Sequence, residues 1–161
     1  DIACGIGYGT QMLANFSPES HVTGVDIHKG AVLYGREYYS APNADFMEGD
    51  ALSVEFGIKF DTIVSFETLE HLTDYKRFVA SMYGLLKDGG ELILSTPNQD
   101  AMPYTPQSFP YHIRHFTPAE LAKLLEDAGF HVEHWYSQRD QNSVEAESNT
   151  DGRFLIVVAH K

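Results

Sequence analysis

Two glutamates and one histidine lie close together in the segment F-E-T-L-E-H-L, which spans residues 66–72. If a helical turn begins at Glu67, the side chains of Glu67, Glu70 and His71 stand at positions i, i+3 and i+4 and share one face. Two carboxylates and an imidazole can ligate a divalent cation. The segment follows a predicted strand, so the sequence predicts a metal site at the carboxyl end of that strand.

Two other interpretations of this segment stay open. His71 alone could act as a general base, because an imidazole titrates near neutral pH. Glu67 and Glu70 could also be solvated side chains at the start of a helix, where the helix dipole favours acids. The sequence therefore leaves three alternatives: a metal site, a metal-free base and no catalytic role.

A glycine-rich loop opens the chain with D-I-A-C-G-I-G-Y-G-T. Gly5, Gly7 and Gly9 allow the backbone to turn tightly and to approach a ligand closely. The helix that follows would present its N-terminus to an anionic group such as a carboxylate. The dinucleotide fingerprint G-x-G-x-x-G requires a third glycine where this sequence has Thr10. We therefore predict a loop for an adenosylmethionine-type cofactor rather than for NAD.

Two acidic residues follow the loop at the ends of predicted strands. Asp26 ends V-T-G-V-D, and a carboxylate at this position can accept hydrogen bonds from both ribose hydroxyls of a nucleoside. Asp50 lies in E-G-D-A after the next strand and could accept a hydrogen bond from an adenine amino group. The alternative for Asp26 is a helix cap or a turn residue, and the alternative for Asp50 is an ordinary turn residue.

Strand and helix signals alternate along the chain, which predicts an α/β fold with a mostly parallel sheet. We expect strands at residues 21–26, 44–47, 62–66, 91–96, 131–136 and 154–160, the last two forming an antiparallel hairpin at the edge of the sheet. We expect helices at residues 10–16, 29–39, 74–87 and 118–128.

Two helix ends are marked by local signals. Thr117 is a natural N-cap, Pro118 suits the first turn, and Glu120 completes a capping box. Gly129 stands where a helix commonly stops. The segment K-D-G-G at residues 87–90 is expected to end the preceding helix.

Two stretches show no regular periodicity. Residues 97–116 contain four prolines and follow the carboxyl end of a predicted strand, where α/β folds keep their ligands. We interpret this stretch as a substrate-side loop, with a disordered insertion as the alternative. Residues 138–152 are polar and are expected to join the last two strands.

Composition limits the partners and the environment. The 161 residues suit a single domain, and Lys plus Arg number 11 against 23 Asp plus Glu, which gives a net charge of −12. This acidic balance argues against nucleic acid and favours a small-molecule acceptor. Cys4 is the one cysteine, so no intrachain disulfide can form, and we expect a cytoplasmic protein. No apolar run is long enough to span a membrane.

In chain order, the sequence contains the segments DIACGIGYG, GVDI, EGDA, FDTIVSFETLEHL, LLKDGGELILSTPN and HFTPAELAKLLEDAGF. This series resembles the class I S-adenosylmethionine-dependent methyltransferases, and within them the ubiquinone-biosynthesis O-methyltransferase group and its small-molecule and sugar-modifying relatives. The resemblance implies one Rossmann-like methyltransferase domain over residues 1–161. It also implies methyl transfer from S-adenosyl-L-methionine to a hydroxyl oxygen of a phenol or sugar. The alternatives are N- or C-methylation, and a module that binds the cofactor without catalysis.

The resemblance also implies which residues bind the cofactor and a metal. The cofactor residues would be Asp1, Gly5, Gly7, Gly9, Asp26, Ile27, Asp50, Ala51 and Phe66. The E-x-x-E-H pattern resembles the metal site of the ubiquinone O-methyltransferases and of the small-RNA 3′-terminal 2′-O-methyltransferases. In the latter, a histidine shortly before a helix-starting threonine is a fourth ligand, which implies His112, with His115 as a nearby substitute. The ligands would be Glu67, Glu70, His71 and His112, and the ion Mg²⁺ or another divalent cation. The acidic charge argues against the RNA-modifying activity of this second group.

The family's first strand ends at the acid that Asp1 matches, and the apolar residues of that strand do not precede Asp1 in this sequence. We therefore expect the sequence to be a piece of a longer reading frame. Strands next to the missing one would keep unpaired backbone groups, and such exposed sheet edges could support an oligomer.

Overall fold

The computed structural model describes residues 1–140 and 145–161, which form two compact units, Asp1–Glu55 and Phe56–Lys161. Each unit has its own sheet and its own buried core. Among the described residues, no helix is both long enough and apolar enough to cross a membrane.

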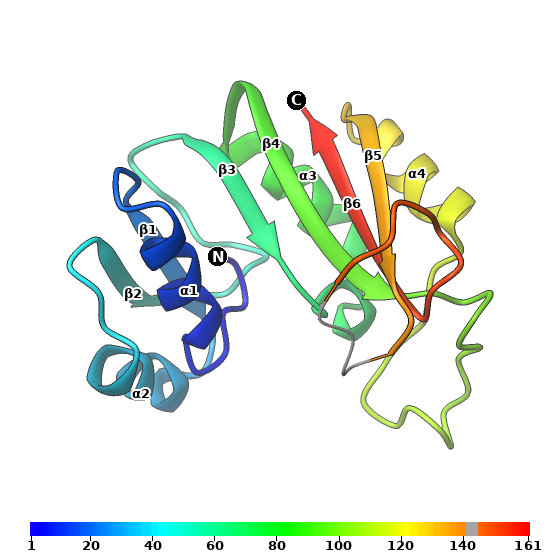
Figure 1. Cartoon of the computed structure of the whole chain (residues 1–161), viewed down its shortest axis with the longest axis horizontal. Coiled ribbons are helices and arrows are strands. Elements are labelled where there is room, and N and C mark those ends of the chain that lie inside the picture. Colours follow the sequence, from blue (N-terminus) through cyan, green and yellow to red (C-terminus); the bar gives the residue numbers. More distant parts are fainter. Residues whose placement is uncertain (141–144) are drawn as a thin grey trace. The chain divides into compact units, whose positions relative to one another are not determined.

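The first unit is built on a parallel pair of strands. Strands β1 (Val22–Asp26) and β2 (Ala44–Glu48) pair in register from Val22 opposite Ala44 to Asp26 opposite Glu48. Helices α1 (Tyr8–Phe16) and α2 (Lys29–Tyr38) contact both strands (Figure 1). The carboxyl ends of β1 and β2 therefore lie at one edge of this sheet.

The start of the chain runs beside β1. Ile2 forms a parallel bridge with Val25, whose amide donates to the carbonyl of Asp1 at 2.8 Å. The amide of Cys4 donates in turn to the carbonyl of Val25 at 2.9 Å. These hydrogen bonds place the glycine loop directly at the end of β1.

The ring of Phe46 organises the core of the first unit. It is 5% exposed and packs among three glycines, Gly7, Gly24 and Gly35. A Cβ atom added to Gly24 would lie 2.6 Å from the Thr10 hydroxyl and 2.9 Å from the Phe46 ring. At Gly24 and Gly35, the absence of a side chain makes room for an aromatic ring rather than for a ligand.

The second unit contains a four-stranded sheet in the order β3-β4-β6-β5. Its strands are β3 (Phe60–Ser65), β4 (Leu86–Pro97), β5 (His131–Gln138) and β6 (Phe154–His160). Strands β3 and β4 pair in parallel, whereas β6 runs antiparallel between β4 and β5. The prediction of a Rossmann-like α/β fold, mostly parallel with an antiparallel C-terminal hairpin, is confirmed.

Two helices and a short turn complete the second unit. Figure 1 shows α3 (Tyr75–Leu85) and α4 (Pro118–Asp127) on the same face of the sheet. The 3₁₀ turn η1 (Leu69–His71) follows β3. The predicted capping box is present, because Thr117 and Glu120 each accept a hydrogen bond from the other's backbone amide.

The start of β4 differs from the prediction. We expected the segment at 87–90 to end a helix that reached residue 87, but α3 ends at Leu85 and β4 begins at Leu86. Phe60 pairs with Leu86 and Thr62 with Glu91, so the glycine segment is an irregularity within the strand pairing. Gly89 has a φ of 76°, which allows the chain to bulge there and still rejoin the ladder.

The two irregular stretches join the elements as expected. Pro97 ends β4, residues 98–116 contain no helix or named strand, and a bridge between Asn98 and Phe116 closes the base of this loop. The polar stretch at 138–152 connects β5 to β6, and its residues 141–144 lie outside the described part of the chain.

The packing around Phe46 predicts the effect of two glycine substitutions. Gly24→Ala should destabilise the protein by about 1–3 kcal/mol, because the added methyl group overpacks the ring. Gly30→Ala, in a helix with nothing within 4 Å of the added atom, should be neutral or stabilise the protein by up to about 1 kcal/mol. Urea unfolding midpoints will compare the two variants, and an equal shift in both would contradict the packing.

Candidate functional site

The glycine loop of the first unit leaves open space at one residue. Gly5 has a φ of 56° and nothing within 4 Å of an added Cβ atom. Gly7 is the N-cap of α1 with a φ of 94°, and it offers no side-chain oxygen to the first turn. The first amides of α1 therefore have no side-chain cap, and a carboxylate could accept hydrogen bonds from them.

Asp26 holds this loop in place. Its side chain is 7% exposed, and its Oδ2 and Oδ1 atoms accept hydrogen bonds from the amides of Gly5 and His28, each at 2.8 Å. Each carboxylate oxygen can accept a second hydrogen bond. The predicted ribose acceptor is thus also the tether between the glycine loop and the turn before α2.

Asp1 and Thr10 form a second tether that sequence reasoning missed. The Thr10 hydroxyl, fully buried, donates to Oδ2 of Asp1 at 2.7 Å. An added Cβ atom on Gly9 would lie 3.5 Å from the same oxygen. The threonine that replaces the third dinucleotide glycine therefore has a structural use, since its hydroxyl ties α1 to the start of the loop.

The remaining cofactor candidates of this unit lie at the ends of the two strands. Ile27 follows Asp26 and is 59% exposed. The carbonyl of Asp26 accepts from the amide of Gly49 at 3.0 Å, which brings the segment of Asp50 and Ala51 next to the end of β1. Asp50 is exposed, and its Oδ1 accepts from the amide of Leu52 at 2.9 Å, the turn role considered as its alternative.

In the second unit, the expectation that a helical turn begins at Glu67 is wrong. Glu67 has a φ of 50°, which places its backbone in the left-handed region, and the turn η1 starts only at Leu69. The amide of Glu67 donates to the hydroxyl and the carbonyl of Ser95, and the Ser95 hydroxyl donates to Oε1 of Glu67 at 2.7 Å. Ser95 thus holds Glu67 in its strained backbone conformation.

Three of the four predicted metal ligands come together in the second unit. Ligand atoms of Glu70, His71 and His112 all lie within 4.8 Å of one another. Glu70 is 1% exposed, and its Oε2 accepts from the Thr96 hydroxyl at 3.0 Å. Its Oε1 lies 3.8 Å from Nε2 of His71. One carboxylate and two imidazoles could therefore hold a divalent cation at this point.

The loop 97–116 is attached to η1 by its far end. The amide of Ile113 donates to the carbonyl of Glu70 at 2.6 Å. Nδ1 of His71 lies 2.8 Å from the carbonyl of Tyr111, and a carbonyl can only accept, so Nδ1 carries the proton. Nε2 of His71 is left with the lone pair that a metal ion or a substrate proton requires.

His115 lies behind the cluster rather than in it. It is 2% exposed, and its Nε2 lies 2.7 Å from Nδ1 of His112, while its Nδ1 lies 2.6 Å from the carbonyl of Met102. Both ring nitrogens of His115 therefore have partners, and it is His112 that groups with Glu70 and His71. Phe66, the last predicted cofactor residue, lies in the second unit and is 46% exposed.

The environment favours neutral groups in the cluster. Burial raises the pKa of Glu70 to about 7. Burial of its carboxyl group, and then repulsion by Glu70, raises the pKa of Glu67 to about 7, although the residue as a whole is exposed. Burial lowers the pKa of His112 and of His115. Neutral imidazoles next to carboxyl groups that resist ionisation are a setting that a cation would stabilise.

Ser95 and Thr96 were not selected from the sequence as residues of the site, although their position in the sequence indicated it. They stand near the carboxyl end of β4, which pairs in parallel with β3. Carboxyl ends of parallel strands meet at one edge of a sheet. The reasoning that selected the acids after β3 therefore applies equally to the hydroxyls at the end of β4.

Comparison with known proteins supplies a family. A family profile described as "Methyltransferase domain" matches residues 1–135. A protein of Mycolicibacterium smegmatis named "Probable S-adenosylmethionine-dependent methyltransferase" is 34% identical over 137 residues, which are 83% of this chain and 51% of that protein. A malonyl-[acyl-carrier protein] O-methyltransferase of Acetivibrio thermocellus is 31% identical over 96 residues, which are 60% of this chain and 34% of that protein. The chain thus spans about half, or less, of the length of these relatives.

Among solved structures, the chain is similar to one from a complex of the Haloferax volcanii methyltransferase activator Trm112 with a methyltransferase. The TM-score is 0.83 with 19% identity, over 99% of this chain and 80% of that chain. At this identity the similarity shows the fold alone.

The raised pKa values predict how stability depends on pH without a metal. A carboxyl group whose pKa is higher in the folded state stabilises the protein fully below its unfolded pKa and loses this contribution as the pH rises through the folded value. Glu70→Gln removes one such group and keeps an acceptor for Thr96. Its thermal stability relative to wild type should therefore rise between about pH 5 and about pH 8, measured in EDTA. A difference that does not change with pH would contradict the burial of an ionisable carboxyl group.

Proposed function

Because the chain belongs to the methyltransferase domain family, we propose that it transfers a methyl group from S-adenosylmethionine to a hydroxyl oxygen of a small molecule. The observation that supports the proposal is a buried aspartate hydrogen-bonded to a glycine loop that has free space for a ligand. Asp26 lies at the end of β1, and its carboxylate is hydrogen-bonded to the loop in which Gly5 leaves free space.

Different residues of the first unit would bind different parts of the methyl donor, S-adenosylmethionine. Asp26 would accept from the ribose hydroxyls through its remaining lone pairs. The uncapped start of α1 would bind the methionine carboxylate, with Gly5 giving it room. The exposed side chain of Ile27 would pack against the adenine ring, and Asp50 would accept from its amino group, with Ala51 beside it. Together these contacts would fix the position of the sulfonium methyl group.

At the site proposed for the methyl acceptor, the carboxylate and imidazole groups fit a divalent cation. Glu70, His71 and His112 would hold it, and Glu67 could add a fourth ligand through the carboxylate oxygen that does not face Ser95. A bound cation would supply orientation of the acceptor oxygens and a lowered hydroxyl pKa. Mg²⁺ prefers oxygen ligands, whereas two imidazoles favour Mn²⁺, Fe²⁺ or Zn²⁺.

Without a metal, His71 could still serve as a general base. Its Nδ1–H donates to the carbonyl of Tyr111, which orients the ring and leaves Nε2 to accept the proton of the substrate hydroxyl. In either case the main contribution of the protein is to position donor and acceptor. The choice of an oxygen acceptor is supported by the relative named an O-methyltransferase, and that of a small molecule by the net charge of −12.

The donor assignment is tested by binding of S-adenosylhomocysteine, the demethylated product. Asp26→Asn should weaken binding by about tenfold or more, because hydrogen bonds to a charged acceptor are worth about 1.5–3 kcal/mol each. Asp45→Asn is the matched control, since Asp45 lies in β2 with an exposed side chain that contacts only His21 among the described contacts. Calorimetry measures both affinities. Equal affinity in the two variants, or tighter binding of NAD by the wild type, would reject the cofactor site.

The acceptor assignment is tested by methyl transfer to a panel of phenols and sugars in EDTA and after addition of Mg²⁺ or Mn²⁺. We expect the chelator to abolish transfer, because the acceptor hydroxyl then lacks its activating cation. Addition of the metal should restore transfer. Full activity in excess chelator would exclude the metal and leave His71 as a lone base. Cofactor binding with no transfer to any acceptor would instead favour a binding module without catalysis.

A further inference from the structure

We infer that His115 is a positioning residue that holds His112 in the tautomer whose Nε2 atom keeps the lone pair that a metal ion requires. This inference rests on the proposed metal-dependent function. It goes beyond the ligand set, because His115 contributes no ligand atom and acts only through its hydrogen bonds to His112 and to the backbone of Met102.

The carbonyl of Met102 determines which groups donate and which accept in this series of hydrogen bonds. The oxygen of Met102 lies 2.6 Å from Nδ1 of His115, and a carbonyl oxygen can only accept. Nδ1 of His115 therefore carries a proton. In the neutral ring, Nε2 is then an acceptor, and its partner must donate.

That partner is Nδ1 of His112, at 2.7 Å from Nε2 of His115. His112 must therefore carry its proton on Nδ1, which leaves the lone pair on Nε2. The carbonyl of Met102 therefore determines, through the buried ring of His115, which nitrogen of His112 can bind a cation. His71 is set in the same way by the carbonyl of Tyr111, so the two candidate imidazole ligands share one tautomer.

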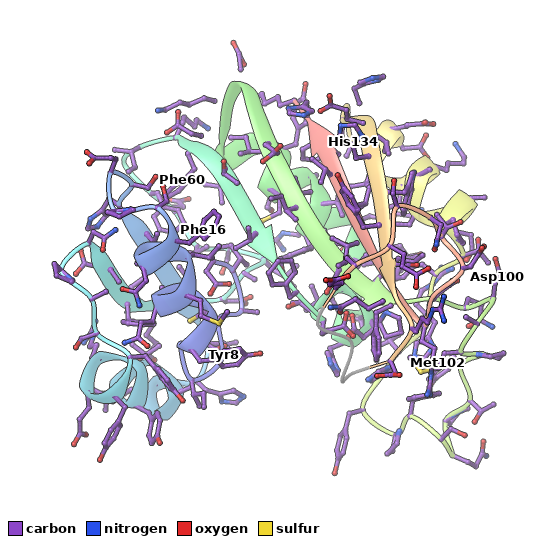
Figure 2. All side chains as sticks on the ribbon, viewed as in Figure 1. Tyr8, Phe16, Phe60, Asp100, Met102 and His134 are labelled. Atoms are coloured by element: carbon purple, nitrogen blue, oxygen red, sulfur yellow. The ribbon has the colours of Figure 1, made fainter. Side chains whose placement is uncertain are left out.

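The carbonyl that starts this chain of hydrogen bonds is itself well held. Figure 2 shows Met102 on the loop that follows β4. Its amide donates to the carbonyl of Asn98 at 2.7 Å, and its sulfur accepts from Arg153 at 3.2 Å. Asn98 is 1% exposed, and its side-chain amide donates to the carbonyls of Thr150 and Gly152. The position of the Met102 carbonyl is therefore tied to the start of β6 as well as to the end of β4.

His112 needs such a partner because its own surroundings do not fix the ring. It is only half-buried, and its other neighbours, Phe109 and His71, contact it ring to ring, with centroids 5.2 Å and 4.7 Å away. Ring contacts restrict orientation but do not select a tautomer. Partners that orient ligating imidazoles typically change metal affinity by about 10–100-fold when they are removed.

The experiment measures Mn²⁺ affinity by calorimetry in the wild type and three variants. His115→Phe keeps a ring in the buried space and removes both hydrogen bonds, so Mn²⁺ should bind about tenfold or more weakly. Phe109→Leu removes the ring contacts with His112 and His115 but none of the atoms that form their side-chain hydrogen bonds, and its affinity should stay within about twofold of wild type. His112→Ala removes the ligand and should show the largest loss.

Metal-free protein supplies a second readout, and its wild-type measurement does not depend on the fold of any variant. Long-range ¹H–¹⁵N correlation spectra of the histidine rings report which nitrogen is protonated. Wild-type His112 should show the Nδ1–H tautomer, and His115→Phe should show a mixture. A wild-type His112 in the Nε2–H tautomer would overturn the inference directly.

The outcomes distinguish failure of the positioning role from failure of the metal site on which it rests. Absence of Mn²⁺ binding in the wild type, or binding that His112→Ala does not change, would contradict the metal site itself. Binding that His112→Ala abolishes and His115→Phe leaves intact would overturn the positioning role alone.

Discussion

The burial of one carboxyl group, that of Glu70, is the constraint on which the candidate site depends. The side chain is 1% exposed, and the groups next to its oxygens, the Thr96 hydroxyl and the His71 ring, carry no fixed positive charge. An ionised carboxylate is costly in such surroundings, which raises the pKa of the group, and a nearby cation would favour its ionised form. His71 and His112 beside it each have Nδ1 committed to a hydrogen bond. In the proposed function, these imidazoles would be the other ligands of a cation that stabilises the ionised form of Glu70.

Much of the fold could be predicted because its elements repeat simple patterns. Alternating strand and helix signals located all six strands, and the Thr117–Glu120 capping box marked the start of α4 without error. The end of α3 was placed two residues too late, because Gly89 and Gly90 were interpreted as a helix stop. Their actual place is a bulge in β4, which depends on pairing with β3. Local signals describe a segment by itself and cannot report which distant strand it will pair with.

The candidate site was predicted less completely than the fold. Spacing along the chain brought Glu70 and His71 together correctly, since both lie in one short turn. The spacing argument assumed a helical turn from Glu67, but the positive φ of that residue, maintained by hydrogen bonds to Ser95, delays the turn until Leu69. It could not distinguish the roles of His112 and His115, which are separated only by the way the loop folds back on itself. Long-range contacts of this kind become visible only when the whole loop has a structure.

The position of β6 has a consequence for how the second unit is made on the ribosome. Residues 154–160 are synthesised after β5, yet they lie between β4 and β5 in the sheet. Until they leave the exit tunnel, β5 has no neighbouring strand to join, and the edge of β4 is open to pairing with other nascent chains. Glu91 finally pairs with His160, a contact between residues far apart in sequence, and such contacts form slowly. The sheet of the second unit can therefore close only after residues 154–160 have been synthesised.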